Sequence, residues 1–374
     1  MIQFLQLELC LSRVKEYLTC RFGQSHLYKG ASSVRILVTG GAGFIGSNFV
    51  RRIVDGTFKG FSSVTVLDKL TYAGNLTNFA EIPKDSMQFI EGDICDAELV
   101  GKLASEHDLV INFAAESHVD RSIKSSRDFI LTNVLGTQTL LDEIRKSNVQ
   151  TYVQVSTDEV YGSIETGSWP ETDPLLPNSP YAASKAGSDL VCRTYFKTHQ
   201  MDVRITRCSN NYGRNQFPEK VIPLFITNLI DNQKVPIYGS GKNVRDWLHV
   251  EDHARALALV FTGGRLGQSY NIGGRNERTN LAVVEAIADL LDQEVPLKSG
   301  SRRSLITFVG DRPGHDLRYA IDASKIEGEL GWRAKYTFET GLKDTISWYM
   351  RNQDWWQPLR AARYAGERLG KASS

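Results

Sequence analysis

The sequence has few cysteines, and their arrangement excludes two common kinds of structure. Five occur among 374 residues, at Cys10, Cys20, Cys95, Cys192 and Cys208. Their number is odd and none form a CxxC pair, so we expect the reduced thiols of a cytoplasmic protein rather than a disulfide framework. No cysteine and histidine grouping has the spacing of a zinc site, so we expect no metal.

The sequence also has almost no net charge. Lysine and arginine number 44 against 43 aspartate and glutamate residues, a formal charge of +1. This balance argues against a broad basic surface for nucleic acid or membranes, although an anionic small molecule stays possible. No apolar run is long enough to span a bilayer. With 41% hydrophobic and 23% charged residues, the chain has the composition of a globular protein with a sizeable core.

The two ends of the chain differ from the rest. Residues 1–33 precede the first clear strand, and charged residues such as Glu8, Arg13 and Lys15 interrupt their apolar positions. A secretory peptide needs an uninterrupted apolar stretch, so we expect an amphipathic appendage or a disordered tail. Residues 351–374 form a tail that is basic and alanine-rich beyond Pro358, which predicts a peripheral helix or a frayed end.

Between the ends, short β-branched runs alternate with helical periodicity. The predicted strands are 34–39, 64–67, 88–91, 109–113, 152–156 and 203–206. The predicted helices are 44–55, 97–105, 127–146, 181–199 and 281–291. This alternation predicts an α/β fold with a doubly wound parallel sheet. The pattern weakens after Arg207, so we expect one domain over 34–207 and a smaller, partly interleaved region over 208–350.

A glycine-rich turn follows the first predicted strand. Gly40 permits the tight turn, Gly43 allows a pyrophosphate to approach the backbone, and Gly46 allows close packing of helix on strand. Such a pattern alone also fits a structural turn. Here a strand precedes it, a helix follows it, and Asp68 ends the second strand at the spacing of a ribose-binding acid. The segment therefore predicts a dinucleotide site in a Rossmann domain.

Asp68 also bears on which dinucleotide is bound. A carboxylate bonds the ribose hydroxyls and repels a 2′-phosphate, which favours NAD over NADP, although Lys69 beside it weakens this argument. Asp93, after the third strand, is placed to bond the adenine or to occupy a solvated turn.

Tyr181 and Lys185 lie one helical turn apart in Tyr-Ala-Ala-Ser-Lys. An exposed pair at this spacing is common on any helix. After a dinucleotide fold, however, it is typical of catalysis: the lysine bonds the nicotinamide ribose and lowers the pKa of the tyrosine, whose phenolate accepts a proton from an alcohol. We therefore predict that Tyr181 is the base.

Thr157, Asp158 and Glu159 directly follow the fifth strand, where side chains face the ligand crevice of such a sheet. Thr157 is placed to bond the same substrate hydroxyl as Tyr181. Simple oxidation or epimerisation needs no further acid. Two adjacent carboxyl groups suit β-elimination, in which one removes a carbon-bound proton and the other protonates a leaving hydroxyl. The alternative role is to cap a turn.

At this point the sequence resembles the dTDP-glucose 4,6-dehydratases, extended short-chain dehydrogenases/reductases, over about residues 34–350. The matching segments are LVTGGAGFIG (37–46), DKLTYAGN (68–75), GDICD (92–96), AAESHVDRSI (114–123), STDEVYG (156–162), YAASK (181–185), 210–223, RDWLHVEDH (245–253), 270–274 and 310–322. The Thr-Asp-Glu triplet distinguishes this family from epimerases and decarboxylases, which are alike elsewhere.

The resemblance implies a cycle and a set of partners. Tyr181 deprotonates the C4 hydroxyl of the sugar while hydride passes to NAD, Glu159 removes the C5 proton, and Asp158 protonates the departing C6 hydroxyl. Hydride then returns to C6, so NAD is held tightly and regenerated, and the product is the 4-keto-6-deoxy sugar nucleotide of a deoxysugar pathway. Helices 127–146 and 181–199 resemble those that pair in the family's homodimers. The short loop between Gly162 and Tyr181 is similar to versions from antibiotic pathways.

The resemblance also assigns contact residues. Besides Thr157, the substrate contacts are Ser117, His118, Asn210, Lys220, Arg245, Asn271, Arg312 and His315. The cofactor contacts are Gly40, Gly43, Phe44, Ile45, Gly46, Asp68, Lys69, Thr71, Gly74, Asp93, Ile94, Ala114, Ala115, Thr132, Tyr181 and Lys185. For the substrate contacts, each position taken singly is also compatible with a structural role.

Two features depart from the family pattern, and three alternative functions stay open. Arg214-Asn215 stands where the family usually has proline, which leaves the tolerance for different sugars open, and residues 1–33 are not part of the pattern. The alternatives are a UDP-sugar 4,6-dehydratase, a sugar-nucleotide 4-epimerase and a non-catalytic NAD-binding scaffold. The carboxyl pair argues against the epimerase, and the intact tyrosine–lysine pair argues against the scaffold.

Overall fold

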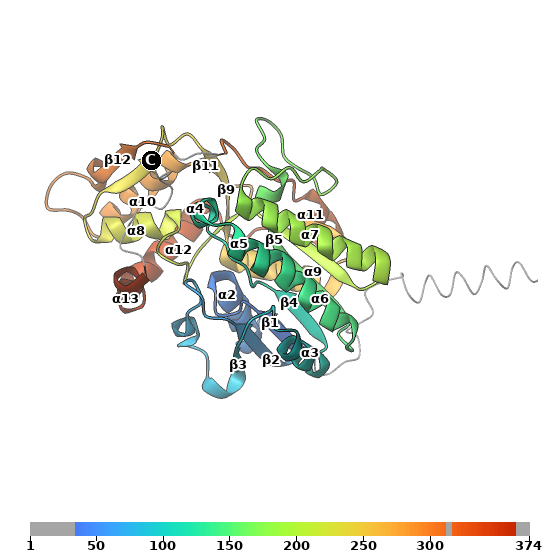
Figure 1. Cartoon of the computed structure of the whole chain (residues 1–374). Coiled ribbons are helices and arrows are strands. Elements are labelled where there is room, and N and C mark those ends of the chain that lie inside the picture. Colours follow the sequence, from blue (N-terminus) through green and yellow to red (C-terminus); the bar gives the residue numbers. More distant parts are fainter. Residues whose placement is uncertain (1–33, 312–315, 364–374) are drawn as a thin grey trace, which may run out of the picture.

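A seven-stranded parallel sheet forms the centre of the computed structural model, which describes residues 34–311 and 316–363 (Figure 1). The strands are β1 (Val34–Thr39), β2 (Phe61–Asp68), β3 (Gln88–Glu91), β4 (Leu109–Asn112), β5 (Thr151–Thr157), β6 (Val203–Cys208) and β10 (Ser269–Ile272). Their order is β10-β6-β5-β4-β1-β2-β3, and every neighbouring pair is parallel. The predicted doubly wound α/β class is confirmed. The strand order reverses between β1 and β4, where sheets of this kind bind ligands.

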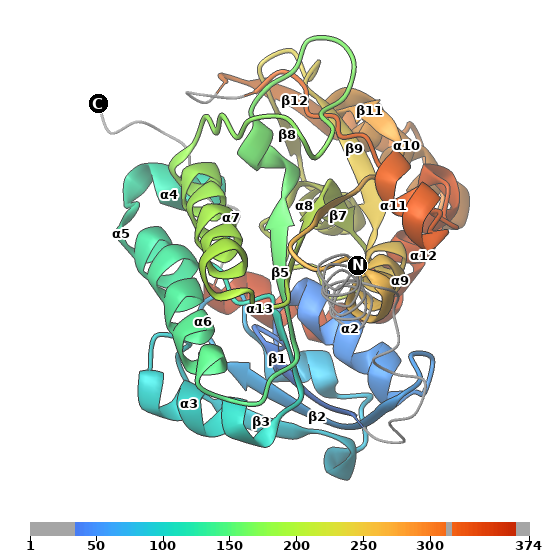
Figure 2. The ribbon, with the colours of Figure 1, turned by 90° about the vertical axis from the view of Figure 1, so that its right-hand side faces the viewer.

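Helices cover both faces of this sheet (Figure 2). One face carries α3 (Ala97–Glu106), α6 (Thr137–Arg145) and α7 (Pro180–His199), and the other carries α2 (Phe44–Val54), α9 (Val250–Gly263) and α11 (Ser324–Leu330). Successive side chains of a strand point to opposite faces. Ile36 and Val38 of β1 therefore pack in one core with Phe49, while Leu37 packs in the other with Leu140.

A second region lies beyond the carboxyl ends of the strands (Figure 1). It contains β7 (Asn210–Tyr212), β8 (Val235–Tyr238), β9 (Val244–His249), β11 (Glu277–Thr279), β12 (Ile306–Val309), α8 (Val221–Ile230), α10 (Asn280–Glu294), α12 (Phe338–Arg351) and α13 (Gln353–Arg363). Its core joins side chains of α8, α10 and α12, and Trp356 of α13 is buried within it. The chain crosses between the two regions, because β10, α9 and α11 return to the main sheet.

The elements expected from the sequence occur at nearly the expected bounds, with one difference. The predicted helix 127–146 is α5 (Arg127–Phe129), a π-helical segment (Ile130–Gly136) and α6. Within the π segment, the Asn133 amide accepts a hydrogen bond from the Glu116 backbone N–H (2.9 Å) and donates one to the Glu116 carbonyl (3.0 Å). This tertiary contact, which helical periodicity does not encode, ties the segment to the loop after β4.

Short helices complete the description: α4 (Val119–Lys124) and 3₁₀ turns at Leu76–Phe79, Lys84–Ser86, Asp158–Tyr161 and Arg302–Leu305. No helix in the described ranges is long and apolar enough to cross a membrane. Cys95, Cys192 and Cys208 are free thiols, and Cys10 and Cys20 lie outside the described residues.

Candidate active site

A pocket of about 300 Å³ lies at the carboxyl ends of β1, β2, β4, β5 and β6. Every residue that the sequence assigned to the cofactor lines it, from Gly40 to Lys185. So do the three residues of the Thr157–Glu159 triplet. Parallel strands end at one edge of a sheet, so residues more than 100 positions apart in sequence meet there.

The glycine turn has the shape that a phosphate group needs. Gly40 has a φ of +70°, and a Cβ there would lie 2.3 Å from the Ala114 backbone nitrogen. A Cβ at Gly46 would lie 2.5 Å from the Gly40 carbonyl oxygen, so α2 packs close to the turn. Helix α2 begins at Phe44 without a side-chain cap. Its first-turn N–H groups therefore stay available to an anion in the pocket.

The end of β2 carries the acid that the sequence predicted. The Asp68 carboxylate accepts hydrogen bonds from the Ala42 N–H (2.9 Å) and the Leu70 N–H (2.8 Å), which orient it at the pocket wall. Burial raises the pKa of Asp68 above its usual value. Lys69 Nζ is 2.6 Å from Asp93 Oδ2. Its charge is thereby largely neutralised, which weakens the one sequence feature that spoke for a 2′-phosphate.

Tyr181 and the Thr157–Glu159 triplet come from two neighbouring elements. Ser179 caps α7 by accepting a hydrogen bond from the Ala182 N–H (3.1 Å), which starts the helix just before Tyr181. Thr157 ends β5, and its hydroxyl accepts one from the Glu159 N–H (3.3 Å), which begins the 3₁₀ turn with both carboxyl groups. The Thr157 hydroxyl also donates to Asp158 Oδ1 (3.3 Å).

The environment of Asp158 favours its protonated form. Asp158 is 2% exposed. Its pKa is raised well above the usual range by burial and then by the nearby Glu159 and Asp246 carboxylates. This favours the neutral acid, a proton donor. One of its oxygens, Oδ2, is buried and has no hydrogen-bond partner among the described residues.

The pKa of Tyr181 is shifted in the direction opposite to that predicted from the sequence. The sequence predicted that Lys185 lowers the pKa of Tyr181. Instead burial, followed by the Glu159 charge, raises the pKa of Tyr181 well above its usual value. The Lys185 ammonium donates to the Val155 carbonyl (2.7 Å), and burial lowers its own pKa. Burial disfavours the charged phenolate of Tyr181 relative to the neutral phenol, which is why the pKa of Tyr181 is raised.

The predicted substrate contacts fall into three groups. Ser117, Asn210 and Lys220 line the pocket with Thr157, and the buried Asn210 Oδ1 has no hydrogen-bond partner among the described residues. His118, Arg245 and Asn271 lie outside the lining. Arg312 and His315 lie outside the described residues.

The three residues away from the lining are engaged in other contacts. Asn271 accepts a hydrogen bond from the Tyr161 hydroxyl (2.9 Å) and donates one to the Trp169 carbonyl (2.9 Å), so its amide holds the protein together. Arg245 donates to backbone carbonyls, including that of Asp316 (2.9 Å). His118 Nε2 lies 3.8 Å from Glu219 Oε1. Their predicted substrate roles stay predictions.

The lining also includes residues that the sequence reasoning missed: Tyr72, Glu116, Asn211, Gln216, Phe217 and Glu219. The Glu219 side chain is fully buried and pairs with Arg121 (3.3 Å). A signal was available, since Glu219 precedes the predicted Lys220. Acidic residues of loops are usually solvated, however, and only the fold shows that this one turns inward.

Comparison with known proteins identifies a family model, sequence relatives and solved structures that resemble this chain. Residues 37–345 match the family model described as GDP-mannose 4,6 dehydratase. A dTDP-glucose 4,6-dehydratase of an Actinoplanes species is 54% identical, over 86% of this chain and 100% of the relative. The crystal structure of DesIV, a dTDP-glucose 4,6-dehydratase from Streptomyces venezuelae with NAD and TYD bound, is 53% identical. It matches with a TM-score of 0.83 over 87% of this chain and 99% of its own. For the Bacillus anthracis dTDP-glucose 4,6-dehydratase in complex with NAD, the identity is 48% and the TM-score 0.79, over 87% and 99% of the two chains.

Proposed function

We propose, from the premise that this chain belongs to the GDP-mannose 4,6-dehydratase family, that it is an NAD-dependent dTDP-glucose 4,6-dehydratase. It converts dTDP-glucose to dTDP-4-keto-6-deoxyglucose and water. Two relatives, 54% and 52% identical to this chain over nearly their whole length, are named dTDP-glucose 4,6-dehydratases. The observation that carries the proposal is the buried Asp158 beside Glu159 in the same pocket as Tyr181.

The residues present fit NAD. The uncapped N-terminus of α2 would bind the pyrophosphate, and Asp68 would bind the adenosine ribose. Lys185 and Tyr181 would bind the nicotinamide ribose. When bound, NAD supplies a nicotinamide ring that takes hydride from C4 of the sugar and later returns it to C6. The Asp68 carboxylate and the pairing of Lys69 with Asp93 both disfavour a 2′-phosphate, which favours NAD over NADP.

The chain's own residues perform the proton transfers. Tyr181 accepts the proton of the C4 hydroxyl, and Thr157 orients that hydroxyl. The 4-keto group then makes the C5 proton acidic, and Glu159 removes it. Asp158 gives its proton to the C6 hydroxyl, which leaves as water. When hydride returns to C6, C5 takes up a proton that has exchanged with solvent, which gives the 4-keto-6-deoxy sugar. The raised pKa of Asp158 suits the donor role, since a protonated acid must be present before the C6 oxygen departs.

Elimination with retained cofactor is the property that tests this function. We expect dTDP-glucose, incubated with the purified protein in D₂O without added cofactor, to lose one water and to gain one deuterium at C5. Mass spectrometry of the product measures both changes. Conversion to a galactose epimer of unchanged mass would indicate an epimerase. Turnover of UDP-glucose but not dTDP-glucose would indicate a UDP-sugar 4,6-dehydratase. Turnover of neither sugar nucleotide would favour the non-catalytic NAD-binding scaffold.

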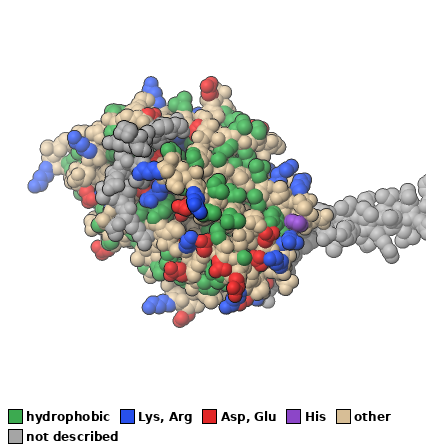
Figure 3. All heavy atoms as spheres, viewed as in Figure 1, with side chains coloured by type: hydrophobic (Ala, Val, Ile, Leu, Met, Phe, Trp, Pro, Cys, Tyr) green, Lys and Arg blue, Asp and Glu red, His purple; other side chains and the backbone are tan. Residues whose placement is uncertain are grey.

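A homodimer is part of the proposal. Ile130, Leu131 and Leu135 of the π segment and Leu190 of α7 are exposed by 39–52%. Figure 3 shows hydrophobic side chains gathered on the face that carries α5, α6 and α7 in Figure 1. An apolar patch of this kind on a helical face is typical of an interface. A second copy fits it, since a two-fold axis brings the same patch to itself.

The dimer is tested by charge placed in that patch. For the wild type, light scattering after size exclusion is expected to give about twice the 41.8 kDa of one chain. Leu131→Glu is expected to shift the mass towards that of one chain, because a buried unpaired carboxylate is costly. Phe308→Glu, at a 58% exposed position on β12, is the control and leaves the mass unchanged. A wild type with the mass of one chain would contradict the proposal.

A further inference from the structure

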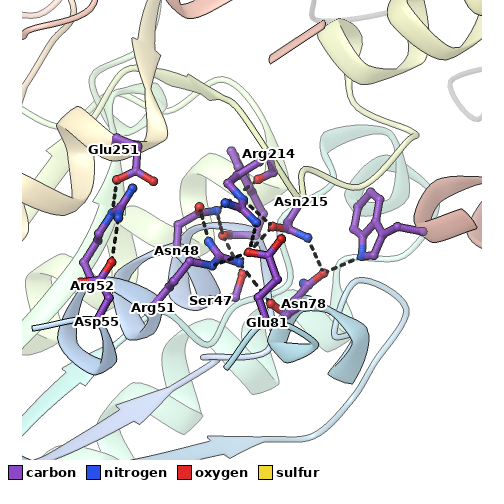
Figure 4. Close-up of polar contacts among 12 residues, drawn as sticks. Ser47, Asn48, Arg51, Arg52, Asp55, Asn78, Glu81, Arg214, Asn215 and Glu251 are labelled. Carbon is purple, nitrogen blue, oxygen red and sulfur yellow. Dashed lines mark hydrogen bonds and ion pairs between the residues drawn. The ribbon is translucent and has the colours of Figure 1, made fainter. Parts of the chain in front are cut away.

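Five polar residues form a cluster behind the pocket, which we call the Arg51 cluster: Asn48, Arg51, Asn78, Arg214 and Asn215 (Figure 4). Asn48 and Arg51 lie on α2, Asn78 lies in the 3₁₀ turn Leu76–Phe79, and the last two belong to the loop after β7. Arg214-Asn215 is the segment that departs from the family pattern. None of the five lines the pocket, and the function proposed above does not use them.

Arg51 joins the three segments of the cluster. Its guanidinium donates to Asn48 Oδ1 (2.8 Å), to the Asn78 carbonyl (3.1 Å) and to Asn215 Oδ1 (3.1 Å). The residue is 8% exposed. Burial, followed by the charge of Arg214, lowers the pKa of Arg51 to about 10. The side chain stays protonated near neutral pH, so three uncharged acceptors hold a buried cation, and the exposed Glu81 carboxylate lies 3.9 Å from its Nε.

One side of the cluster reaches the glycine turn. Asn78 Nδ2 donates to the Ala42 carbonyl (2.8 Å), and the Ala42 N–H donates to Asp68 Oδ2 (2.9 Å). Asn78 Oδ1 accepts from Trp355 Nε1 of α13 (3.0 Å). Asn78 is therefore fixed between the turn that lines the pocket and the last described helix.

The other side reaches the opposite wall of the pocket. Asn215 has a φ of +63°, and its amide donates to Asn78 Oδ1 (3.3 Å). Asn48 Nδ2 donates to the Arg214 carbonyl (3.1 Å), and Arg214 pairs with Glu81 (2.5 Å). The next two residues of the loop, Gln216 and Phe217, line the pocket. We call Gln216 and Phe217 the loop wall. The loop wall is thus attached to α2 through side chains that do not line the pocket.

We propose that Arg51 is a positioning residue for the sugar nucleotide: through Asn215 it holds the loop wall at a fixed place relative to the glycine turn. The inference rests on the proposed function, since it assigns the loop wall to the substrate. Only a planar guanidinium reaches three acceptors in different directions from one buried site. Without it, Asn215 Oδ1 keeps its neighbour Arg214 as a donor (3.4 Å) but loses the hydrogen bond from α2, and the loop gains conformational freedom that substrate binding must then remove.

Substitution of Arg51, with a neighbour as control, tests this inference. Arg51→Met keeps the aliphatic stem and removes the donors. We expect the KM for dTDP-glucose to rise about tenfold, equal to about 1.4 kcal/mol, with kcat within about threefold of wild type. Arg51→Lys keeps the charge but reaches fewer acceptors, so an intermediate KM is expected. Arg52→Ala is the control, because Arg52 on the same helix pairs with Asp55 (2.7 Å) and Glu251 (2.6 Å) and not with the loop.

A second variant and a second readout keep the test decisive. Asn215→Gly tolerates the positive φ and removes the acceptor, so it is expected to raise KM as Arg51→Met does, even if Arg51→Met does not fold. Hydrogen exchange of the backbone amides in 214–217 is expected to be faster in both variants and unchanged in Arg52→Ala. An unchanged KM and unchanged exchange in Asn215→Gly would overturn the inference. If the wild type does not turn over dTDP-glucose, the proposed function fails, and the exchange comparison still decides the role of Arg51.

Discussion

Tyr181→Phe is expected to lower kcat by about 10²–10⁴-fold, the usual range for loss of a general acid or base. The variant loses only the hydroxyl that accepts the C4 proton, and the ring keeps its edge contact with Phe129. Lys185 and the glycine turn are unchanged, so the bound NAD content is expected to equal that of the wild type. Steady-state kinetics and the absorbance of released cofactor measure the two quantities.

The matched control for this substitution lies on the same helix. Tyr195 is the other α7 tyrosine with a hydroxyl partner: it donates to Asp142 (2.5 Å) and lies outside the pocket lining. Tyr195→Phe is expected to change kcat by less than about twofold, since a surface hydrogen bond has little effect on the site. If Tyr181→Phe kept a tenth or more of the wild-type kcat, Tyr181 would not be the base.

Asp158→Asn and Glu159→Gln are expected to separate the two halves of the elimination. Each variant is expected to lower kcat by about 10²–10⁴-fold. Glu159→Gln removes the base for the C5 proton, so deuterium from D₂O no longer enters C5 of the sugar. Asp158→Asn keeps that base and removes the proton donor for the C6 hydroxyl. Deuterium therefore still enters C5 while water loss is slow, which mass spectrometry of the recovered sugar nucleotide distinguishes.

The pH dependence follows from the same assignment. Asp158 must be protonated to act, and burial raises its pKa well above the usual range, so its contribution to catalysis is present below that pKa and is lost as the pH rises through it. This alkaline loss is expected to disappear in Asp158→Asn, whose residual activity lacks the acid. Glu165→Gln, at an exposed carboxylate, is the control and keeps the wild-type pH profile.

In the deuterium experiment, identical exchange at C5 in Asp158→Asn and Glu159→Gln would contradict the separate roles of acid and base for these two residues.

The fold was predictable because its signals are local. The strands of the main sheet are buried on both faces, so they appear as short β-branched runs, and the helices between them have one apolar face. The π segment at Ile130–Gly136 was not predictable, because Asn133 is held there by the Glu116 backbone, 17 residues away. The return of β10 to the sheet was equally hidden, since it depends on pairing with β6.

The candidate site divides in the same way. The glycine turn, Asp68, the Thr157–Glu159 triplet and the Tyr181–Lys185 pair were found in the sequence, because each has a fixed spacing along one strand or helix. The pKa direction of Tyr181 was predicted wrongly, because burial depends on what the rest of the chain places around the phenol. Glu219 was missed for the same reason: its side chain turns inward only in the folded protein.

The sequence by itself determined the sheet, the cofactor motif and the catalytic residue types, because periodicity and motif spacing are properties of neighbours along the chain. The tertiary structure alone decided which groups are desolvated and which distant segments touch. It made Asp158 a buried acid, paired Lys69 with Asp93, and joined Arg51 to Asn215 across 164 positions. Desolvation and long-range contacts depend on the whole packed chain, so no short window of sequence contains them.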